Sequence, residues 1–350
     1  MIAADDIVRT REEAGAREPL LVVDPLLAFL DAHGLGEGEP EFEAIGDGHS
    51  NVTFAVRRGS AELVVRRPPR GPLPPSAHDV LREARILRAL AGRVPVPEVL
   101  AVCADPDVIG APFYVMSRLD GIVLSGAPAP ALAGHERATG EALVDTLVAL
   151  HAVDWRAAGL EGFGRPDGYL ERQLARFGDL WERNRTRELP AMERVGAWLA
   201  AHRPASPPAT IVHGDFRLGN LMYASAPPPR VVALLDWEMS TIGDPLADLG
   251  YLCTFWVQRD DPPAGIFEQH AFTRGEGWPT REELLARYAE RSGRALGDIG
   301  WYRVLALWKI IVFMEGNYRR ALAGSVDDPY LTAFGEAIAG LAERAAALTR

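Results

Sequence analysis

Lysine is almost missing from this chain of 350 residues, in which lysine and arginine together number 37 and Lys309 is the only lysine. Arginine must therefore supply every other permanent positive charge. It keeps its charge at physiological pH and can bind two oxygens at once, but its planar head differs in shape from an ammonium group. A site that other proteins build around a lysine has to be built differently here.

Cysteine is also scarce. The two cysteines, Cys103 and Cys253, lie far apart in apolar stretches. This number and spacing argue against a disulfide framework and against a zinc site, and they predict two buried free thiols.

Long apolar runs are absent too. No segment approaches the length of a membrane span, and the first residues, MIAADDIVRTREEAG, lack the pattern of a signal peptide. We therefore expect a cytoplasmic protein without a membrane partner. The formal net charge of −11 argues against a nucleic-acid partner and is compatible with a cationic ligand. Hydrophobic residues make up 48% of the chain, enough for the core of one large or two ordinary domains.

The stretch from Thr210 to Leu252 combines apolar strands with polar side chains. Asp215 opens a loop, Asn220 follows five positions later, and Asp236 ends the next apolar strand. Kinases need this set: one aspartate for the attacking hydroxyl, and an asparagine with a second aspartate for magnesium. The alternative is ordinary turn chemistry between core strands. Ionised carboxylates beside buried strands are costly unless something compensates them, which favours the functional reading.

The motifs His213-Gly214-Asp215 with Asn220, Asp236-Trp237-Glu238 and Gly243-Asp244-Pro245-Leu246-Ala247-Asp248 resemble the aminoglycoside phosphotransferase (choline kinase-like) family. This resemblance implies an α+β, protein-kinase-like fold of two lobes. The N-terminal lobe would be a small β-sheet with one helix, and the larger C-terminal lobe mainly helical. The segments VVRRPP, SAHDVLREARIL, VIGAPFYVMSRLDG and VHGDFRLGNLMY resemble the branch whose phosphotransferase domains are fused to acyl-CoA dehydrogenases.

The resemblance also implies roles for single residues. Asp215 would orient the substrate hydroxyl and accept its hydrogen, while Asn220 and Asp236 would bind Mg²⁺. Asp248 would brace the catalytic loop, and His213 would support it. The expected cofactors are ATP (or GTP) and Mg²⁺, and the expected partner is a small molecule that accepts a phosphoryl group on a hydroxyl.

A glycine-bearing turn precedes a predicted β-hairpin with strands over 52–58 and 62–67. Gly46 and Gly48 would let backbone amides approach a phosphate, and Ser50 and Asn51 could donate hydrogen bonds to it. By itself this pattern is more often a tight turn, but the downstream motif favours a nucleotide loop.

A kinase-like lobe needs a cation on its third strand, held by a glutamate on the next helix. Arg66 is the candidate cation, and Glu83, on a helix predicted over 78–90, is its candidate partner. Arginine at this position is usual in the branch that the chain resembles. The alternative for Glu83 is an exposed carboxylate that pairs with the neighbouring helix arginines Arg82, Arg85 or Arg88.

Two more strands, over 94–103 and 111–117, complete the predicted small lobe. The chain then enters a segment suited to an interlobe hinge, where backbone groups around Ser117 and Leu119 would bind the adenine. We therefore expect an N-terminal nucleotide-binding lobe over 1–120, loosely ordered over 1–20, and a C-terminal catalytic and acceptor-binding lobe over 121–350.

Beyond this point the sequence is typical of helices. Thr280 and Glu283 form a predicted capping box for a helix to Ser292, and the apolar segment 299–320 is the predicted buried spine of the large lobe. Its last turns carry Glu315, Asn317 and Arg319, which are either acceptor-site residues or simply a solvated helix end.

Three functions stay open, and the sequence does not predict the oligomeric state. The first is a kinase for an aminoglycoside-like hydroxylated cation, whose acidic cleft Asp260, Asp261 and Glu276 could line. The second is a kinase for hydroxy acids or their coenzyme A thioesters, which would need an arginine-lined cleft. The third is a catalytically dead nucleotide-binding module, against which the intact Asp215, Asn220 and Asp236 argue.

Overall fold

The computed structural model describes residues 6–15, 17–45, 51–71, 78–263, 265–324 and 329–349. Gly46, Gly48 and Ser50, predicted to hold phosphate, lie outside these ranges. The chain divides into two compact units. The first unit is Met1–Asp120 together with Ala233–Glu238, and the second is Gly121–Val232 together with Met239–Arg350.

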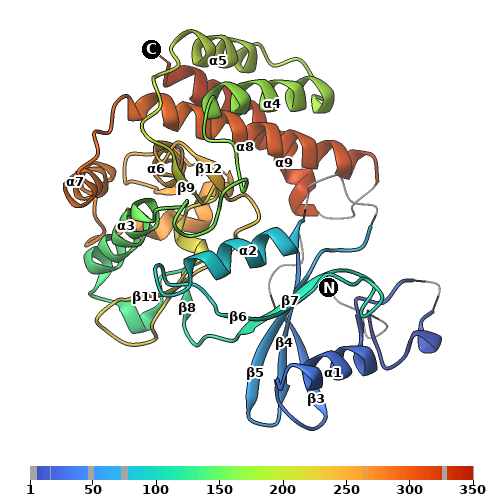
Figure 1. Ribbon diagram of the computed structural model, residues 1–350. Helices are drawn as coiled ribbons and strands as arrows, with labels where there is room; N and C mark the ends of the chain where they lie inside the picture. Colours follow the sequence, from blue (N-terminus) through green and yellow to red (C-terminus); the bar gives the residue numbers. More distant parts are fainter. Residues whose placement is uncertain are drawn as a thin grey trace. The chain divides into compact units, whose positions relative to one another are not determined.

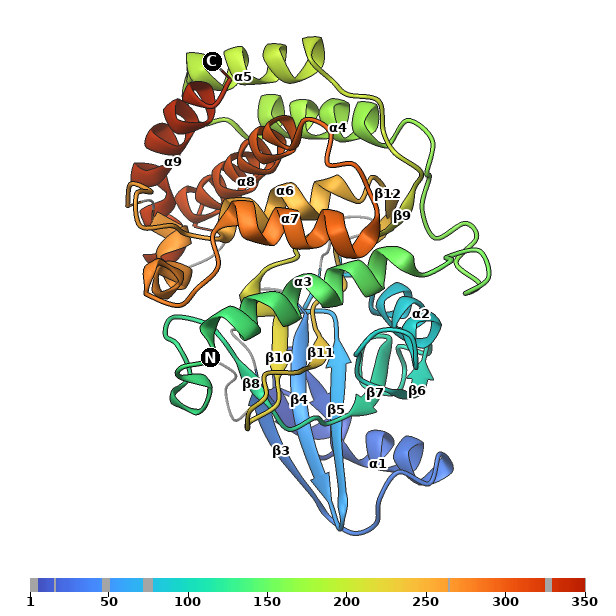
Figure 2. The ribbon, with the colours of Figure 1, turned by 90° about the vertical axis from the view of Figure 1, so that its left-hand side faces the viewer.

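The first unit is built on a five-stranded antiparallel sheet in the order β3-β4-β5-β7-β6 (Figure 2). Its strands are β3 (Pro40–Ile45), β4 (Val52–Arg58), β5 (Ala61–Arg67), β6 (Val99–Cys103) and β7 (Phe113–Ser117). A two-residue turn at Gly59 and Ser60 joins β4 to β5, and Gly59 adopts a φ of 58° that glycine tolerates without strain. The predicted hairpin is confirmed.

The two faces of this sheet differ because successive side chains of a strand point in opposite directions. One face packs against α1 (Val23–Ala32), whose Leu26 and Leu30 share a core with Phe54 and Val65. The other face carries Arg66 and is covered by α2 (Val80–Leu90), which packs against β6 and β7. This alternation places a charged side chain between a sheet and a helix.

Described residues near the start of the chain form regular structure. In the described part of the first 20 residues, β1 (Ile7–Val8) pairs in parallel with β2 (Leu21–Val22), and η2 (Arg11–Glu13) forms a short turn of 3₁₀-helix. Val8 and Leu20 are buried. Helix α1 begins at Val23, without a side-chain cap. Burial of these apolar side chains outweighs the polar composition around them.

The second unit is mainly helical (Figure 1). Its described helices are α3 (Glu136–Ala152), α4 (Tyr169–Asn184), α5 (Pro190–Ala201), α6 (Leu246–Phe255), α7 (Arg281–Ser292), α8 (Ile299–Leu322) and α9 (Pro329–Ala347), with short 3₁₀ segments η3 (Pro130–Leu132), η4 (Leu218–Asn220) and η5 (Gly265–Arg274). Helix α8 packs against α4, α5, α6 and α9, and its buried residues face all round. The predicted central spine is confirmed.

Short strands in the second unit hold its polar loops. Strand β9 (Thr210–Val212) pairs antiparallel with β12 (Thr241–Gly243), and β8 (Ile122–Val123), β10 (Leu221–Tyr223) and β11 (Val231–Leu234) form a small sheet in the order β11-β10-β8. The predicted capping box of α7 is confirmed, since the side chains of Thr280 and Glu283 each accept from the other's backbone N–H. These two small sheets frame the loop from His213 to Asn220.

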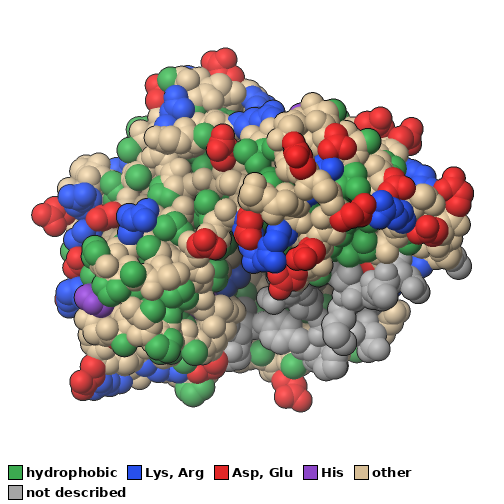
Figure 3. Space-filling model, turned by 90° about the horizontal axis from the view of Figure 1, so that it is seen from below, with side chains coloured by type: hydrophobic (Ala, Val, Ile, Leu, Met, Phe, Trp, Pro, Cys, Tyr) green, Lys and Arg blue, Asp and Glu red, His purple; other side chains and the backbone are tan. Residues whose placement is uncertain are grey.

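Both cysteines are buried free thiols, as predicted. Burial raises the pKa of the Cys253 thiol to about 11. Among the described helices, none has both the length and the apolar character that crossing a membrane requires. Acidic and basic side chains alternate over the face seen in Figure 3, so the net charge does not gather into a patch of one sign there.

Candidate active site

In the first unit, three side chains form a row across neighbouring strands. Thr53 on β4 pairs in register with Arg66 on β5, which pairs in turn with Tyr114 on β7. Residues opposite one another in a sheet point to the same face. The row therefore lies on the face that α2 covers, where Glu83 descends from the helix.

Arg66 uses each of its three nitrogens. Its Nε donates to Oε2 of Glu83 at 2.7 Å, Nη1 donates to the hydroxyl of Thr53 at 3.2 Å, and Nη2 donates to Oδ1 of Asp236 at 3.1 Å. A planar guanidinium presents donors on three nitrogens to partners in different directions, whereas a lysine ammonium presents all its donors from one nitrogen. Arg66 thus joins Glu83, its predicted partner, to Asp236, a predicted Mg²⁺ ligand.

Glu83 is only 2% exposed, so it is not the exposed helix carboxylate that its sequence neighbours allow. Besides Arg66, it accepts from the hydroxyl of Tyr114 at 3.2 Å and from the side-chain amide of Asn51. Burial raises the pKa of the Glu83 carboxyl, and the Arg66 guanidinium opposes this rise. Asn51, predicted to donate to phosphate, donates one N–H of its side-chain amide to Glu83. Its second N–H leaves the phosphate contact a prediction. Tyr114 was not among the predicted residues.

Asp236 adopts a backbone φ of 62° in the left-handed region. Aspartate tolerates this conformation better than most residues, at a cost of about 1 kcal/mol. Its carboxylate is about one-third exposed (32%). Strain at this residue is consistent with a site that needs the carboxylate in one place.

The two predicted hinge residues, Ser117 and Leu119, differ in what the structure shows of their backbone contacts. The backbone N–H of Ser117 donates to the Glu98 carbonyl at 2.9 Å, and its hydroxyl accepts from the Glu98 N–H at 3.0 Å. The Ser117 N–H is therefore not available to an adenine. Leu119 lies just past the end of β7 and stays a prediction.

In the second unit, the loop from His213 to Asn220 presents Asp215. The side-chain amide of Asn220 donates to Oδ2 of Asp215 at 2.6 Å and to its backbone carbonyl at 2.7 Å, and Nε of Arg217 lies 3.3 Å from Oδ1. Both carboxylate oxygens of Asp215 are thereby oriented. Charge-assisted contacts of this kind are the stronger ones and keep such a group in one rotamer.

Asp248 braces this loop from α6. Its Oδ2 accepts from the backbone N–H of His213 and its Oδ1 from that of Gly214, both at 2.7 Å. His151 on α3 contacts Oδ2 through Nε2 at 3.2 Å. Gly214 has a φ of 89°, and a β-carbon there would lie 2.6 Å from the Met239 carbonyl oxygen. The sharp bend that aims Asp215 thus depends on a glycine and on a fully buried carboxylate.

Each unit carries one oxygen of a kind that binds magnesium. Oδ2 of Asp236 and Oδ1 of Asn220 have no hydrogen-bond partner among the residues that the structure describes. Carboxylate and amide oxygens are ligands that Mg²⁺ takes, usually together with phosphate oxygens and water. The same described residues contain no cluster of three or more His, Cys, Asp or Glu that could hold a metal without such help.

A pocket of about 310 Å³ opens beside Asp215 in the second unit. Its polar lining consists of Asp215, Arg217, Gln269 and Asn317. The rest is apolar or aromatic: Tyr251, Phe255, Ile310, Phe313, Met314 and Phe334. Phe313 is 40% exposed, so part of its ring is open to solvent. The described lining of the pocket therefore combines aromatic rings with one carboxylate and one guanidinium.

Of the three acceptor-site candidates on α8, the structure places only Asn317 in this pocket. Glu315 is 0% exposed and accepts from the backbone and the hydroxyl of Thr186. Arg319 donates to the backbone carbonyl of Arg183. Residues at positions i and i+2 of a helix point in different directions, which separates Glu315 and Arg319 from Asn317.

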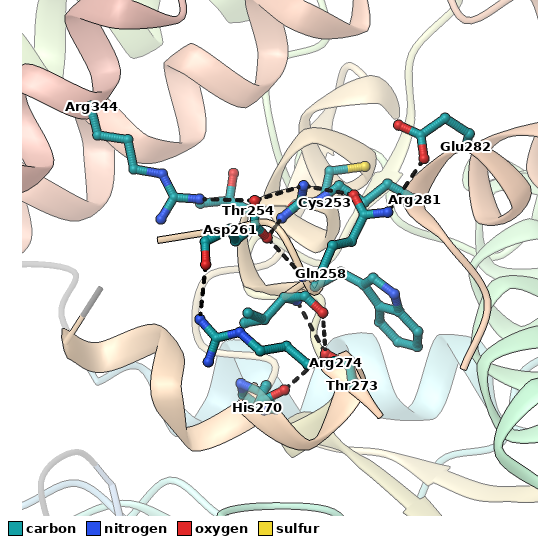
Figure 4. A network of polar contacts seen from close by, with 12 residues as sticks. Cys253, Thr254, Gln258, Asp261, His270, Thr273, Arg274, Arg281, Glu282 and Arg344 are labelled. Carbon is teal, nitrogen blue, oxygen red and sulfur yellow. Dashed lines mark hydrogen bonds and ion pairs between the residues drawn. The ribbon is translucent and has the colours of Figure 1, made fainter. Parts of the chain in front are cut away.

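The acidic residues that could have lined an acceptor cleft are not in the pocket. Asp260 and Glu276 are absent from its lining, and Asp261 is the centre of an arginine network (Figure 4). Arg281 from α7 binds both carboxylate oxygens of Asp261, and Arg344 from α9 lies 3.6 Å from one of them. Hydrogen bonds to Arg281 help to lower the pKa of Asp261 against the effect of burial. This carboxylate connects helices and is not open to a cation.

Comparison with known proteins gives a family match along most of the chain. The phosphotransferase enzyme family matches residues 41–303. Acyl-CoA dehydrogenase family member 10 of Mus musculus is 36% identical over 324 residues, which cover 91% of this chain and 30% of that protein. Across the first three curated relatives, the chain spans between 30% and 43% of their length.

Solved structures give the same result. A provisionally assigned aminoglycoside phosphotransferase of Ralstonia eutropha JMP134 is 31% identical, with a TM-score of 0.79, over 94% of this chain and 98% of that one. A thermostable mutant of aminoglycoside phosphotransferase APH(4)-Ia, in ternary complex with AMP-PNP and hygromycin B, is 15% identical with a TM-score of 0.59, over 88% and 93% of the two chains. The predicted α+β, protein-kinase-like fold is confirmed.

Proposed function

Because the chain belongs to the phosphotransferase enzyme family, we propose that it transfers the γ-phosphoryl group of ATP or GTP, with Mg²⁺, to a hydroxyl of a small molecule. The observation that carries this proposal is Asp215, held by Asn220 and Arg217 at the rim of a pocket. The complex of APH(4)-Ia with AMP-PNP and hygromycin B supports it, since that protein of the same fold holds a nucleotide analogue together with an acceptor.

Asp215 is the proposed catalytic residue. Its carboxylate orients the acceptor hydroxyl and takes its proton as the hydroxyl oxygen forms a bond to the γ-phosphorus and the bond to the β-phosphate oxygen breaks. Asn220 and Arg217 keep the carboxylate in position, so that no rotation has to be frozen during the reaction. In phosphoryl transfer, such positioning and charge neutralisation supply most of the rate.

The first unit is the proposed nucleotide-binding part. The N–H groups of Arg66 that do not bind Glu83, Thr53 or Asp236 are available for phosphate oxygens. Asp236 and Asn220 would hold the metal, each with an oxygen that has no partner among the described residues. When bound, Mg²⁺ neutralises charge on the phosphates.

For the acceptor, the pocket favours a hydroxy acid or its coenzyme A thioester over an aminoglycoside. A polycation needs several carboxylates, and Asp215 is the only carboxylate among the lining residues that the structure describes. The aromatic rings suit an apolar chain, and Arg217 suits an anionic or carbonyl group. The curated relatives, named as acyl-CoA dehydrogenases, support the same class.

The test is a transfer assay with ATP labelled in its γ-phosphate, Mg²⁺ and three sets of acceptors: hydroxy acids, their coenzyme A thioesters and aminoglycosides. We expect label on a hydroxy acid or thioester and none on an aminoglycoside. Asp215→Asn should lower kcat about 1,000-fold, because the replacement cannot accept the proton. Asp260→Asn, an equal change at an exposed aspartate outside the pocket, should leave kcat unchanged.

The possible outcomes of this assay distinguish the three candidate functions. Label on aminoglycosides alone would contradict the acceptor class but keep the phosphotransfer. Full activity in Asp215→Asn would overturn the catalytic assignment. Nucleotide binding without transfer to any acceptor would favour the regulatory module.

A further inference from the structure

Glu83 has two hydrogen-bond donors that a kinase-like ion pair does not require. Tyr114 on β7 donates its hydroxyl to Oε2 at 3.2 Å, and Asn51, just before β4, donates its amide to Oε1. All three side chains are buried: Glu83 and Tyr114 are 2% exposed and Asn51 is 6% exposed. The carboxylate is therefore held from the sheet as well as by Arg66.

These donors matter because the contact between Glu83 and Arg66 is single. It joins Oε2 to Nε at 2.7 Å, whereas the two Nη atoms of Arg66 turn to Thr53 and Asp236. A bidentate pair fixes both groups by itself, but a single contact leaves the carboxylate free to rotate about its last bonds. The bonds from Tyr114 and Asn51 remove that rotation.

The register of the sheet places Tyr114 where it can hold the Glu83 carboxylate beside Arg66. Tyr114 pairs directly with Arg66, and Thr53 pairs with Arg66 from the other side. One carboxylate oxygen, Oε2 of Glu83, thus accepts from both Tyr114 and Arg66. Moving that oxygen would tilt the guanidinium plane and redirect the N–H groups that Thr53 and Asp236 do not use.

We propose that Tyr114 is a positioning residue of the nucleotide site, which acts through Glu83 to fix the direction of the Arg66 guanidinium. This inference rests on the proposed function, because the guanidinium is aimed at the phosphates of the nucleotide. An arginine needs such a guide more than a lysine does, since its donors are arranged in a rigid plane and an ammonium can rotate its N–H groups freely.

The experiment compares Tyr114→Phe with the wild-type protein in binding of ADP without metal, followed by calorimetry, and in steady-state kinetics. Phenylalanine fills the same space, so the change removes one hydrogen bond to a charged group. We expect Kd for ADP and KM for ATP to rise about tenfold, with kcat at saturating ATP changed less than about threefold. A merely structural role would lower the melting temperature and leave Kd and KM unchanged.

Tyr223→Phe is the matched control. Tyr223 is 0% exposed and donates its hydroxyl to the Thr139 carbonyl at 3.2 Å, the same length as the bond from Tyr114 to Glu83. It should lose stability and keep its affinity for ADP. In a Glu83→Gln background, Tyr114→Phe should weaken ADP binding by less than about twofold further, because the two residues act in one chain of contacts.

The outcomes distinguish this inference from the proposed function. If the wild type binds no nucleotide, both fail. If the wild type binds ADP and Tyr114→Phe binds it equally well, the inference alone is overturned. A full tenfold effect that persists in Glu83→Gln would also overturn it, since Tyr114 would then act without Glu83.

Discussion

His270, close to Gly219 in the loop that carries Asp215, is a buried histidine whose ring nitrogens have no hydrogen-bond partner among the described residues. Its ring meets that of Phe255 edge-on, with centroids 6.0 Å apart. Burial and, secondarily, the charge of Arg217 lower the pKa of His270 to about 4, while Asp215 opposes the shift. The histidine is therefore neutral in the folded protein at neutral pH.

This shift predicts a specific loss of stability in acid. Between pH 6.5 and pH 4 the unfolded chain protonates this histidine and the folded protein does not, so the unfolded state binds more protons there. Stability therefore falls as the pH is lowered through this window, by about 3 kcal/mol from this residue. Denaturant unfolding at pH 7 and pH 4.5 should show a smaller fall in His270→Gln than in the wild type.

The control for this measurement is His202→Gln, at an exposed position after α5, which should retain the wild-type fall. Equal falls in all three proteins would contradict the assignment of the acid sensitivity to His270.

For single residues, the sequence predicted the charged side chains of the site, but it did not predict which uncharged side chains bind them. It singled out Arg66 and Glu83, because their order along the chain fits a kinase-like lobe. It assigned Asn51 to phosphate and did not single out Tyr114. The contacts of both residues with Glu83 depend on the register of β4, β5 and β7 and on the packing of α2 against the sheet. A tyrosine at a strand position that alternates with apolar residues is the signal that was available.

At the scale of elements, Asp248 joins three of them. It lies on α6, binds two backbone N–H groups of the loop after β9, and contacts His151 of α3. The resemblance implied that Asp248 braces the loop, and these distances give the brace a physical form. A buried carboxylate that accepts from backbone N–H groups is costly to replace, since an amide presents an acceptor on one side only.

Asp248→Asn should therefore lower the free energy of unfolding by about 3 kcal/mol, measured by chemical denaturation, because one buried N–H loses its acceptor. Asp298→Asn makes the same change at the N-cap of α8, where Oδ1 accepts from the Trp301 N–H at 3.2 Å. An asparagine caps a helix about as well as an aspartate, so this control should lose little. Equal losses in the two variants would show that Asp248 is no special brace.

The elements themselves were predictable where local signals are strong. The hairpin of β4 and β5 follows from its turn residues, and α7 from its capping box. The sequence analysis assigned nothing to α9, although Leu331, Phe334, Ile338, Leu341 and Ala345 recur at helical spacing and are buried. The pocket was not predictable in this way, because its rings come from α6, α8 and α9 and only tertiary packing brings these helices together.

At the scale of the whole molecule, neither unit is one continuous segment of the chain. The segment Ala233–Glu238, which carries Asp236, belongs with the N-terminal residues, although most of the chain around it belongs to the second unit. Two contacts join this segment to the first unit: the hydrogen bond from the Leu234 N–H to the Pro95 carbonyl, and the Arg66–Asp236 ion pair, whose residues are 170 positions apart. No local pattern predicts a contact of that separation.

The proposed function depends most on a magnesium-dependent nucleotide site that includes Asp236. A ligand that binds only the folded protein must raise its melting temperature, in proportion to RT ln(1 + [L]/Kd). The most direct measurement is therefore the melting temperature with ATP or ADP, with and without Mg²⁺, for the wild type and for Asp236→Asn. Asparagine is the chosen replacement because it tolerates the left-handed backbone of this position.

We predict a rise in melting temperature that is larger with Mg²⁺ in the wild type, and no additional effect of Mg²⁺ in Asp236→Asn. The absence of any rise at millimolar nucleotide in the wild type would contradict the account. So would a magnesium effect of equal size in both proteins.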